Sequence, residues 1–487
     1  MTKLTPGSTP SYDDLKAALF RKDAGAADIL IALYGDSIRY DHSADKWYLW
    51  RGQFWQLDAK REVVRLVSHE VSSRFLSLAA HFRGQGDKHA GDASKLAMEL
   101  CQQRTVDAVL RNARTHPMIA LDGSEWDANP LLLGTQSGVV DLRTGNLLPV
   151  EDAKAALIRS VAAVAWEGLN APAPQWEAFV SAILGNDCEL LEAVQRVLGY
   201  GITGLVIERI FAILYGIGAN GKTTLQKILT SIMGTALTMQ ADARALMQSE
   251  RVNPEGARPF LRNLQSKRLV FASEAQTDAE LDPSLIKWAT GNDPITARAL
   301  NENPVQFNPS HLLLFATNDK PKVPANDQAL WDRLRLIPFT QRFVDNPDAQ
   351  RADEHPRDAT LVDRLPLEEG PGILAWLVRG CLAWQMYGLK DADAITKAGL
   401  QYRADAKSDD AVGAWITDKC EEDSSFKEQP TPLFQSWELW AKLNGISDTH
   451  SVIWLGRELQ KRGYQKESKQ YVNYLGLRLI PAKQGNP

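Results

Sequence analysis

The sequence predicts a multidomain α/β protein with an α+β amino-terminal region, a parallel α/β core and a carboxy-terminal winged-helix-like region. Three observations favour this fold class. The chain has 487 residues, more than one hydrophobic core usually organises. Short apolar runs of buried-strand type alternate with helical patterns after residue 204, which is the order of a parallel sheet with helical crossovers. Residues 412–480 have the pattern of three helices followed by strand, turn and strand, which suits a winged helix.

Composition narrows the class of protein. The net charge of −5 gives no global sign of nucleic-acid binding, so any such contact needs a local basic surface. The four cysteines are scattered without a Cys-x-x-Cys pair, which argues against a disulfide framework or a zinc ribbon and favours a reducing cytoplasm. The start of the chain has no apolar signal core, and no apolar run is long enough to span a bilayer. We expect a cytoplasmic protein.

Residues 1–170 are expected to form the amino-terminal α+β domain. Residues 63–80 have helical spacing, whereas the aromatic stretch 46–57 predicts a hairpin around Arg51-Gly52-Gln53. Its aromatics could be a base-stacking platform, but a cross-strand cluster that holds a small sheet together is commoner, and no site is assigned there. Residues 134–147 predict a second hairpin, with its turn at Thr-Gly-Asn.

The rest of the chain divides at changes of pattern. The Ala-Pro-Ala-Pro stretch at 171–174 marks a linker, and the helical pattern from 175 to 204 predicts a collar or oligomerisation segment. Pro-rich and acidic stretches at 346–371 predict surface loops, followed by a helix over 373–387. The expected divisions are therefore residues 171–208 for the helical segment, 209–345 for the nucleotide-binding core, 346–410 for a helical extension with loops, and 411–487 for the carboxy-terminal domain.

Residues 216–223 have the sequence Gly-Ile-Gly-Ala-Asn-Gly-Lys-Thr, which fits the phosphate-loop pattern. An apolar run of strand type precedes them and a helical pattern follows. In such a loop the glycines let backbone N–H groups approach the phosphates, Lys222 neutralises the β- and γ-phosphates, and the Thr223 hydroxyl binds magnesium. The alternative is a glycine turn that happens to precede a lysine. The residues expected at ATP are Gly216, Gly218, Ala219, Asn220, Gly221, Lys222, Thr223 and Thr224.

Three later segments indicate the kind of nucleotide chemistry. The strand-like run 268–274 ends in Glu274, a carboxylate that could orient and polarise water. The run 312–318 delivers Asn318 at its carboxyl end, where ligands of open α/β sheets bind. Arg333 and Arg335 begin a further strand-like run, and Arg333 could reach a neighbour's γ-phosphate as an arginine finger, which requires an oligomer.

These four elements, in this order, resemble the superfamily 3 helicases of viruses, phages and plasmids, a branch of the AAA+ ATPases. Residues 287–298 are similar to that family's motif before a channel hairpin, and the aromatic hairpin, residues 137–145 and residues 199–204 resemble phage and poxvirus-type primase-helicases. The resemblance covers the chain from about residue 20. It implies that Lys222 and Thr223 are Walker A, Glu274 Walker B, Asn318 sensor 1, and Arg333 the finger, with Arg335 the second choice. ATP and Mg²⁺ are then implied, with Thr223 and Glu274 as metal ligands.

The chain departs from this family pattern at two places. The relatives often carry two carboxylates at the end of the Walker B strand, whereas this chain has Ser273-Glu274, so Glu274 could act mainly on the attacking water. The hairpin tip, 301–304, lacks the relatives' basic residue. Channel DNA contacts are therefore assigned to Lys287 and Arg298, although both could be structural ion-pair partners.

The segment 451–487 is locally basic, with seven basic and two acidic residues. A solvated polar face explains this as well as a nucleic-acid surface does. The candidate DNA contacts in this segment are Lys461, Arg462, Lys466 and Lys469.

The sequence therefore predicts an ATP-dependent DNA helicase that forms a ring, expected to be a hexamer, around one strand at a mobile element's replication fork. The resemblance implies movement from 3′ to 5′. A primase is expected to be a separate protein, because the residues ahead of the resemblance cannot hold a polymerase-primase domain. The alternative is an origin-binding or remodelling ATPase that uses ATP as an assembly switch, and a small-molecule kinase is a third reading.

Overall fold

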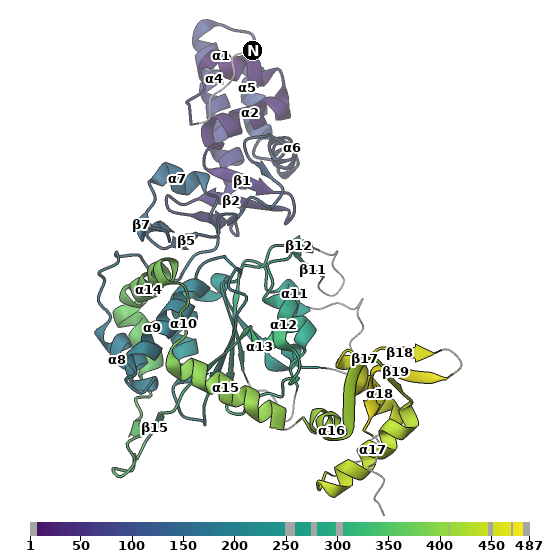
Figure 1. The fold of residues 1–487 in the computed structure, drawn as a ribbon. Helices are drawn as coiled ribbons and strands as arrows, with labels where there is room; N and C mark the ends of the chain where they lie inside the picture. Colours follow the sequence, from purple (N-terminus) through teal and green to yellow (C-terminus); the bar gives the residue numbers. More distant parts are fainter. Residues whose placement is uncertain are drawn as a thin grey trace, which may run out of the picture.

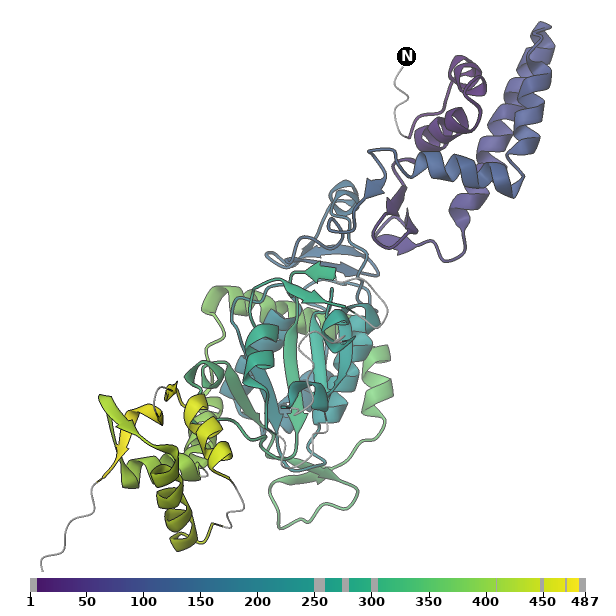
Figure 2. The ribbon, with the colours of Figure 1, turned by 90° about the vertical axis from the view of Figure 1, so that its right-hand side faces the viewer.

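A computed structural model describes residues 7–248, 259–273, 280–298, 305–408, 410–446, 451–468 and 471–480. The chain forms an elongated molecule in which an α/β core lies between a largely helical amino-terminal part and a small carboxy-terminal part (Figures 1 and 2). The expected multidomain α/β class is confirmed. Within the described ranges, no helix has both the length and the apolar character to cross a bilayer.

The amino-terminal part combines helices with a four-stranded sheet of order β3-β2-β1-β4. Buried Leu, Ile, Val and Phe side chains from α1, α2, α4 and α6 form one hydrophobic core against one face of the sheet. A π-helical turn, η1 (Leu66–Val71), joins α3 to α4 within the segment expected to be helical. The elements are α1 (Tyr12–Leu19), α2 (Lys22–Tyr34), β1 (Ile38–Asp41), β2 (Lys46–Trp50), β3 (Trp55–Leu57), α3 (Glu62–Arg65), α4 (Ser72–Gln85), α5 (Ala90–Glu99), α6 (Gln103–Ala113) and β4 (Ala120–Leu121).

The aromatic hairpin forms as expected from β2 and β3, and the two faces of β2 have different environments. Tyr48 and Trp55 are buried against Trp126, which is the cross-strand cluster that the sequence favoured. Trp47 points to the opposite face of the pleat, where it is half-buried against Tyr40 and the helical core. Trp47 therefore lies outside the cluster, as does Phe54.

A second small sheet lies between the amino-terminal part and the core. It has three strands instead of the expected hairpin: β5 (Leu132–Thr135), β6 (Gly138–Asp141) and β7 (Asn146–Leu147), followed by α7 (Val150–Ala155). The Thr-Gly-Asn turn joins β6 to β7 as expected, and a tighter turn at Gln136-Ser137 adds β5. The buried guanidinium of Arg268, at the start of a core strand, donates to the carbonyl of Pro130 at 2.8 Å and thereby fastens this sheet to the core.

The core is a five-stranded parallel sheet of order β14-β8-β13-β10-β9. Alternate residues of each strand point to opposite faces of the sheet, and each face is covered by a hydrophobic layer. In β8, Ala212 and Leu214 pack toward α8, α9, α10 and α14, whereas Phe211 and Ile213 pack on the other face. The strands are β8 (Phe211–Tyr215), β9 (Thr238–Asp242), β10 (Leu269–Ser273), β13 (Leu312–Thr317) and β14 (Leu334–Pro338). The first face carries α8 (Pro174–Ile183), α9 (Cys188–Gly201), α10 (Lys222–Leu237) and α14 (Leu361–Tyr387).

Short elements complete the core. The β11–β12 pair is an antiparallel hairpin whose tip, including residues 301–304, lies outside the described residues. The remaining core elements are η2 (Ala243–Leu246), α11 (Pro259–Arg262), α12 (Pro283–Ala289), β11 (Ile295–Ala297), β12 (Val305–Phe307), α13 (Gln328–Trp331), β15 (Arg342–Val344), β16 (Glu354–Pro356) and α15 (Asp393–Ser408).

Helix α14 corrects the expectation of surface loops up to residue 371. It begins at Leu361 and continues through Pro366 and Pro371. Tertiary contacts override these helix-breaking residues: Gly372 approaches the linker so closely that a Cβ there would lie 1.9 Å from the oxygen of Pro172. The Glu369 carboxylate is buried and accepts hydrogen bonds from the N–H groups of Gln175 at 3.0 Å and Trp176 at 2.9 Å, so it caps α8.

The carboxy-terminal part also differs from the expected order. Between the first two helices the chain forms a nine-residue strand, β17 (Cys420–Glu428), which pairs with β19 in a sheet of order β17-β19-β18. Its charged sequence lacks apolar alternation, and the strand is held by backbone pairing and by contacts such as the ion pair of Glu421 with Arg478 at 2.8 Å. The elements are α16 (Ala411–Lys419), α17 (Pro430–Leu443), α18 (Val452–Lys461), β18 (Lys466–Ser468) and β19 (Val472–Leu479).

Candidate nucleotide site

The glycine-rich loop, residues 216–223, joins the carboxyl end of β8 to the start of α10. Gly216 packs against the end of β14, where a Cβ would lie 2.1 Å from the oxygen of Phe339. Gly221 has φ of 86° and begins α10, and a Cβ there would lie 2.4 Å from Ile183 Cγ2. Gly218 has no atom within 4 Å of its Cβ position. Packing therefore explains Gly216 and Gly221, whereas Gly218 leaves space for a ligand to approach the backbone.

Two other loop residues hold this conformation. Ala219 has a left-handed φ of 63°, and its carbonyl accepts the N–H of Phe343 at 2.7 Å. Left-handed residues next to right-handed ones turn successive N–H groups inward, as in anion-binding nests. Asn220 is buried, and its Oδ1 accepts from Lys222 at 3.0 Å. The loop shape is thus set by contacts with the strands around it.

Lys222 is the central side chain of the site. It is only 6% exposed, and its ammonium donates to the oxygen of Gly216 at 2.5 Å, to Asn220 Oδ1 at 3.0 Å and to Asn318 Oδ1 at 3.1 Å. All three acceptors are neutral, and no carboxylate among the described residues pairs with it. Burial lowers the pKa of Lys222 to about 8. A buried cation without a counter-charge gains free energy when an anion binds beside it.

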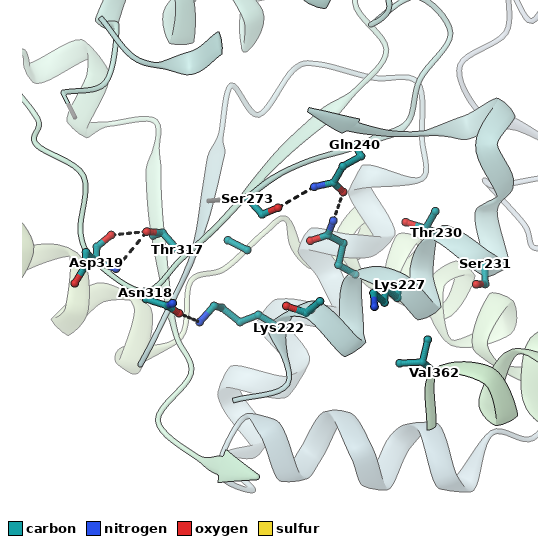
Figure 3. A pocket seen from close by; sticks show the side chains of 13 residues that line it. Lys222, Lys227, Thr230, Ser231, Gln240, Ser273, Thr317, Asn318, Asp319 and Val362 are labelled. Atoms are coloured by element: carbon teal, nitrogen blue, oxygen red, sulfur yellow. Dashed lines mark hydrogen bonds between the residues drawn. The ribbon is translucent and has the colours of Figure 1, made fainter. Parts of the chain in front are cut away.

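A cavity of about 780 Å³ opens beside Lys222 at the carboxyl edge of the sheet. This volume is in the range of small-molecule sites. Figure 3 shows polar side chains from α10, β9, β10 and β13 converging on it. The lining residues are Lys222, Thr223, Gln226, Lys227, Thr230, Ser231, Gln240, Ser273, Ala316, Thr317, Asn318, Asp319 and Val362.

The structure brings Asn318 to Lys222 as the sequence suggested. Strand β13 lies directly between β8 and β10, so its end is next to the glycine-rich loop. Asn318 follows this strand and is exposed to the cavity, which leaves its amide N–H₂ available to a ligand while its oxygen accepts from Lys222. Thr223 is also exposed in the cavity, where a hydroxyl could bind a magnesium ion.

A chain of three polar side chains in the cavity was missed by the sequence reasoning. Gln226 donates to Gln240, and Gln240 donates to the Ser273 hydroxyl at 2.9 Å. Ser273 ends β10, at the position where the resembling family often has a second carboxylate. Gln226 could have been found from its spacing of four residues after Lys222 on α10, but nothing in the sequence placed Gln240 on the neighbouring strand.

Arg333 and Arg335 lie at the opposite end of the sheet from the glycine-rich loop. The carbonyl of Arg333 accepts the N–H of Phe211 at the first residue of β8, about 17 Å of extended strand from the loop. The Arg333 guanidinium donates to the Thr290 hydroxyl at 3.2 Å and to the Ala329 carbonyl at 2.6 Å. Arg335 pairs with Asp391 at 2.7 Å. Neither arginine reaches the cavity of its own chain.

The candidate DNA contacts are in varied environments. Lys287 pairs with Asp327 at 2.9 Å, and Arg462 pairs with Glu458 at 2.9 Å and with Asp410. Arg298 and Lys466 are exposed. Two of the described candidates are therefore engaged by carboxylates, which favours a structural role for them. Glu274, Lys469 and the side chain of Lys461 lie outside the described residues, so their predicted roles stay predictions.

The cavity is large enough for a nucleotide, and the described residues around it form no protein cage for a metal. No group of three or more His, Cys, Asp or Glu residues that could bind a metal occurs in the part of the chain that the structure describes. The Thr223 hydroxyl lies beside buried Lys222, which no described carboxylate neutralises, and this pair fits a magnesium–polyphosphate complex in which the phosphates supply most of the charge. The donor set therefore suits a metal that arrives with its nucleotide.

Comparisons with known proteins give matches on both sides of the linker. Residues 27–185 match the family described as "D5 N terminal like", and residues 214–333 match a family of unknown function, DUF5906. The chain is 24% identical over 424 residues to protein L207/L206 of Acanthamoeba polyphaga mimivirus, which is provisionally named a helicase; the match covers 82% of this chain and 43% of that protein. It is 25% identical over 236 residues to Primase D5 of Fowlpox virus, covering 46% of this chain and 29% of that protein.

The chain thus spans less than half the length of these relatives. Among solved structures, the apo structure of the NrS-1 C-terminal region aligns with 91% of this chain and 96% of its own, at 10% identity and a TM-score of 0.45.

Fold and site together define an α/β protein with a glycine-rich loop at the carboxyl edge of a parallel sheet. Within that class, the matches on both sides of the linker relate the chain to viral replication proteins. The chain is similar to viral primase-helicase-type proteins, and its residues 27–185 match the D5 N-terminal-like family.

Proposed function

We propose that this protein is an ATP-dependent DNA helicase that acts in replication of a mobile element. The observation that carries the proposal is Lys222, a buried cation without a carboxylate partner among the described residues, at the mouth of a nucleotide-sized cavity. The names of the viral relatives, helicase and primase, support the choice of DNA replication. The order of the glycine-rich loop, β10, Asn318 and Arg333 supports the AAA+ superfamily 3 assignment.

Each residue of the cavity has a role in this proposal. The loop N–H groups and Lys222 bind the β- and γ-phosphates, and Thr223 with Glu274 holds magnesium, which neutralises phosphate charge. Asn318 hydrogen-bonds the γ-phosphate or the attacking water through its amide, while Glu274 orients that water. Because Lys222 and Asn318 already contact each other at 3.1 Å, the γ-phosphate site is assembled before the nucleotide binds.

The position of Arg333 supports an oligomer. Since it lies about 17 Å from its own loop, it can serve a γ-phosphate only across a subunit boundary. A closed ring, taken to be a hexamer, places one such boundary at every nucleotide. The β11–β12 hairpin would then line the channel with Lys287 and Arg298 nearby, and hydrolysis would pull single-stranded DNA from 3′ to 5′.

The domain roles follow from the same proposal. Residues 171–208 would form the collar between the amino-terminal domain and the ATPase core of residues 209–345, with residues 346–410 as its extension. Residues 411–487, with helices α16 to α18 and strands β17 to β19, would be a winged-helix-like DNA-binding domain. Lys461, Lys466 and Lys469 would be its phosphate contacts, whereas the two ion pairs of Arg462 favour a structural part for that residue.

The alternative function is a remodelling ATPase that uses ATP only as an assembly switch. Both functions need Lys222, so loss of ATP binding does not separate them. Strand displacement on a forked duplex does. A helicase releases the labelled strand in proportion to the ATP that it hydrolyses. The Glu274→Gln variant should bind ATP but release no labelled strand. Assembly on DNA in ATP, with no strand release beyond that of the Glu274→Gln variant, would favour the switch.

A further inference from the structure

A second cavity, of about 550 Å³, lies in the amino-terminal part, far along the chain from the nucleotide site. Its walls come from β1, β2 and β3 on one side and from the start of α3 and the face of α6 on the other. These elements lie together at the lower end of the helical part, above the core (Figure 1). Neither the glycine-rich loop nor any other residue of the proposed ATPase contributes to it.

Besides Arg114, three cations from different segments line this cavity. Lys46 begins β2, Arg61 precedes α3 and Arg111 lies on α6, and all three are exposed. The structure shows no hydrogen bond or ion pair for their side chains among the residues it describes. By contrast, Arg51 in the same part of the chain is paired with Glu62 at 2.7 Å. Unpaired cations that gather at one cavity indicate an anionic ligand.

The carboxylates in the cavity wall are committed to other partners. Asp58 accepts the N–H groups of Glu62 at 2.6 Å and Val63 at 3.0 Å and so caps α3. Asp107 accepts from Gln103 at 2.7 Å, and Asp45 accepts the hydroxyl of Tyr40. The acidic groups therefore maintain the walls, while the donors of the three cations are available to a ligand.

Aromatic and apolar surface accompanies the positive charge. Trp47 packs edge-to-face on Tyr40 with 4.9 Å between the ring centroids, and it remains half-buried with part of its surface in the cavity. Arg114 lies 5.6 Å from the centroid of the Tyr40 ring and donates to its hydroxyl at 3.3 Å, which holds the guanidinium at the rim. Leu57 is 44% exposed on the same wall. A rigid aromatic surface surrounded by cations suits a nucleotide base with flanking phosphates.

We propose that this cavity binds single-stranded nucleic acid, with Lys46, Arg61 and Arg111 on the phosphates and Trp47 stacking on a base. A duplex does not fit this chemistry, because its bases are already stacked and paired. The volume of about 550 Å³ is enough for one or two nucleotides of a strand that continues over the surface. The site is separate from the ATPase, so it would hold the strand whether or not ATP is hydrolysed.

The test compares two triple variants of the full chain. In the cavity variant, Lys46→Gln, Arg61→Gln and Arg111→Gln remove three positive charges. In the matched control, Lys88→Gln, Lys95→Gln and Arg104→Gln remove the same charge from exposed positions of the same region that do not line the cavity. Both carry Lys222→Ala, so that ATP turnover is not needed and failure of the proposed function does not affect the outcome. Fluorescence anisotropy measures the affinity for labelled oligothymidylate, oligouridylate and duplex DNA at several salt concentrations.

We expect the cavity variant to bind single strands at least tenfold more weakly at low salt, because three phosphate contacts are lost. The plot of log K against log salt should then be shallower, with its negative slope smaller in magnitude by about 2. The control should stay within about twofold of the parent. Oligothymidylate and oligouridylate distinguish DNA from RNA as the source of the strand. Equal affinity and equal salt slope in the two variants would overturn the proposal. It would also be overturned if the cavity variant lost duplex binding as strongly as single-strand binding.

A second comparison tests the stacking on Trp47. An abasic oligonucleotide should bind the parent about tenfold more weakly than oligothymidylate, since each stacked base contributes about 1–3 kcal/mol. Trp47→Leu keeps an apolar side chain against the core and should remove this difference while leaving the salt slope unchanged. If the abasic and normal strands differ as much for Trp47→Leu as for the parent, Trp47 does not stack on a base.

Discussion

At the scale of single residues, Lys222 shows how burial prepares a binding site. Lys222 is 6% exposed and its ammonium is held by three neutral oxygens, so its charge is desolvated, and no carboxylate among the described residues neutralises it. The lowered pKa, about 8, reports this cost. A polyphosphate would supply the missing counter-charge, which is why the proposed ligand is an anion.

Replacing Lys222 with Ala should lower ATP hydrolysis at least about 100-fold, because the side chain contributes the buried cation at the proposed phosphate site. Lys227→Ala is the matched control, since Lys227 lines the same cavity but is exposed. Steady-state hydrolysis of both variants measures the effect, with thermal unfolding to confirm folding. Hydrolysis near the parental rate in a folded Lys222→Ala variant would remove the site assignment.

His311 is a residue whose burial affects stability instead of function. It is fully buried before β13, and burial lowers its pKa to about 4, from an ordinary value of 6.5. The neutral ring is therefore favoured in the folded state, while the unfolded chain binds a proton below pH 6.5. The stability that this contributes is present above pH 6.5 and is lost as the pH falls toward 4.

The His311→Leu variant should therefore lose less stability between pH 7 and pH 4 than the parent, by about 3 kcal/mol. Denaturant unfolding at a series of pH values measures the difference, and subtraction of the two curves cancels the carboxylates that both proteins share. Parallel curves for the two proteins would show that His311 takes up its proton in the folded state at an ordinary pH.

At the scale of elements, α8 and α14 stabilise each other through Glu369. This buried carboxylate accepts two N–H groups in the first turn of α8, at 3.0 Å and 2.9 Å, although the two segments are almost 200 residues apart in the chain. The contact also explains why α14 begins before its prolines. The helical turns around Pro366 and Pro371 contain Glu369, which caps α8, and Gly372, which packs closely against the linker.

Glu369→Gln should destabilise the core by about 1–2 kcal/mol, because an amide has one oxygen acceptor and no charge for the two N–H groups. Glu368→Gln is the control: that side chain is exposed, with a 3.6 Å ion pair to Arg364, and should change stability by less than about 0.5 kcal/mol. Thermal unfolding of both variants compares them. Equal melting temperatures would mean that the cap does not stabilise the folded state.

At the scale of the whole molecule, the two ends of the core sheet have different tasks in the proposed ring. The carboxyl edge carries Lys222 and Asn318, and the amino edge carries Arg333. Since the parallel strands separate these groups by about 17 Å, one chain cannot bring them to the same phosphate. Two copies related by a rotation can, because the amino edge of one then faces the cavity of the next.

Mixing Arg333→Ala subunits with Glu274→Gln subunits should restore hydrolysis that each lacks alone. In random equimolar rings, about one quarter of the boundaries combine an intact finger with an intact Glu274, so roughly a quarter of the parental rate is expected if boundaries act independently. As a control, Arg333→Ala subunits are mixed with subunits that carry both Arg333→Ala and Glu274→Gln. These rings have no intact finger and should stay inactive. Absence of recovery in verified mixed rings would show that Arg333 acts within its own chain or only structurally.

The sequence by itself determined the parts that depend on local patterns. The run of glycines followed by Lys222 between a strand and a helix predicted the loop, and the apolar runs predicted the parallel strands, because each of these signals lies within a few neighbouring residues. The aromatic pair Trp50–Trp55 was also expected, since residues paired across a tight hairpin are near in sequence, whereas only the tertiary structure adds Trp126 to the cluster.

Only the tertiary structure decided the features made by distant segments. Neither the Gln226–Gln240–Ser273 chain nor the Glu369 cap has a local signal, because strand order and helix packing bring these residues together. Strand β17 and the early start of α14 were missed for the same reason: pairing with β19 and packing against residue 172 outweigh the local charge and prolines. The cavity of Lys46, Arg61 and Arg111 likewise exists only because three elements meet there, and the free energy of such contacts is not contained in any one segment.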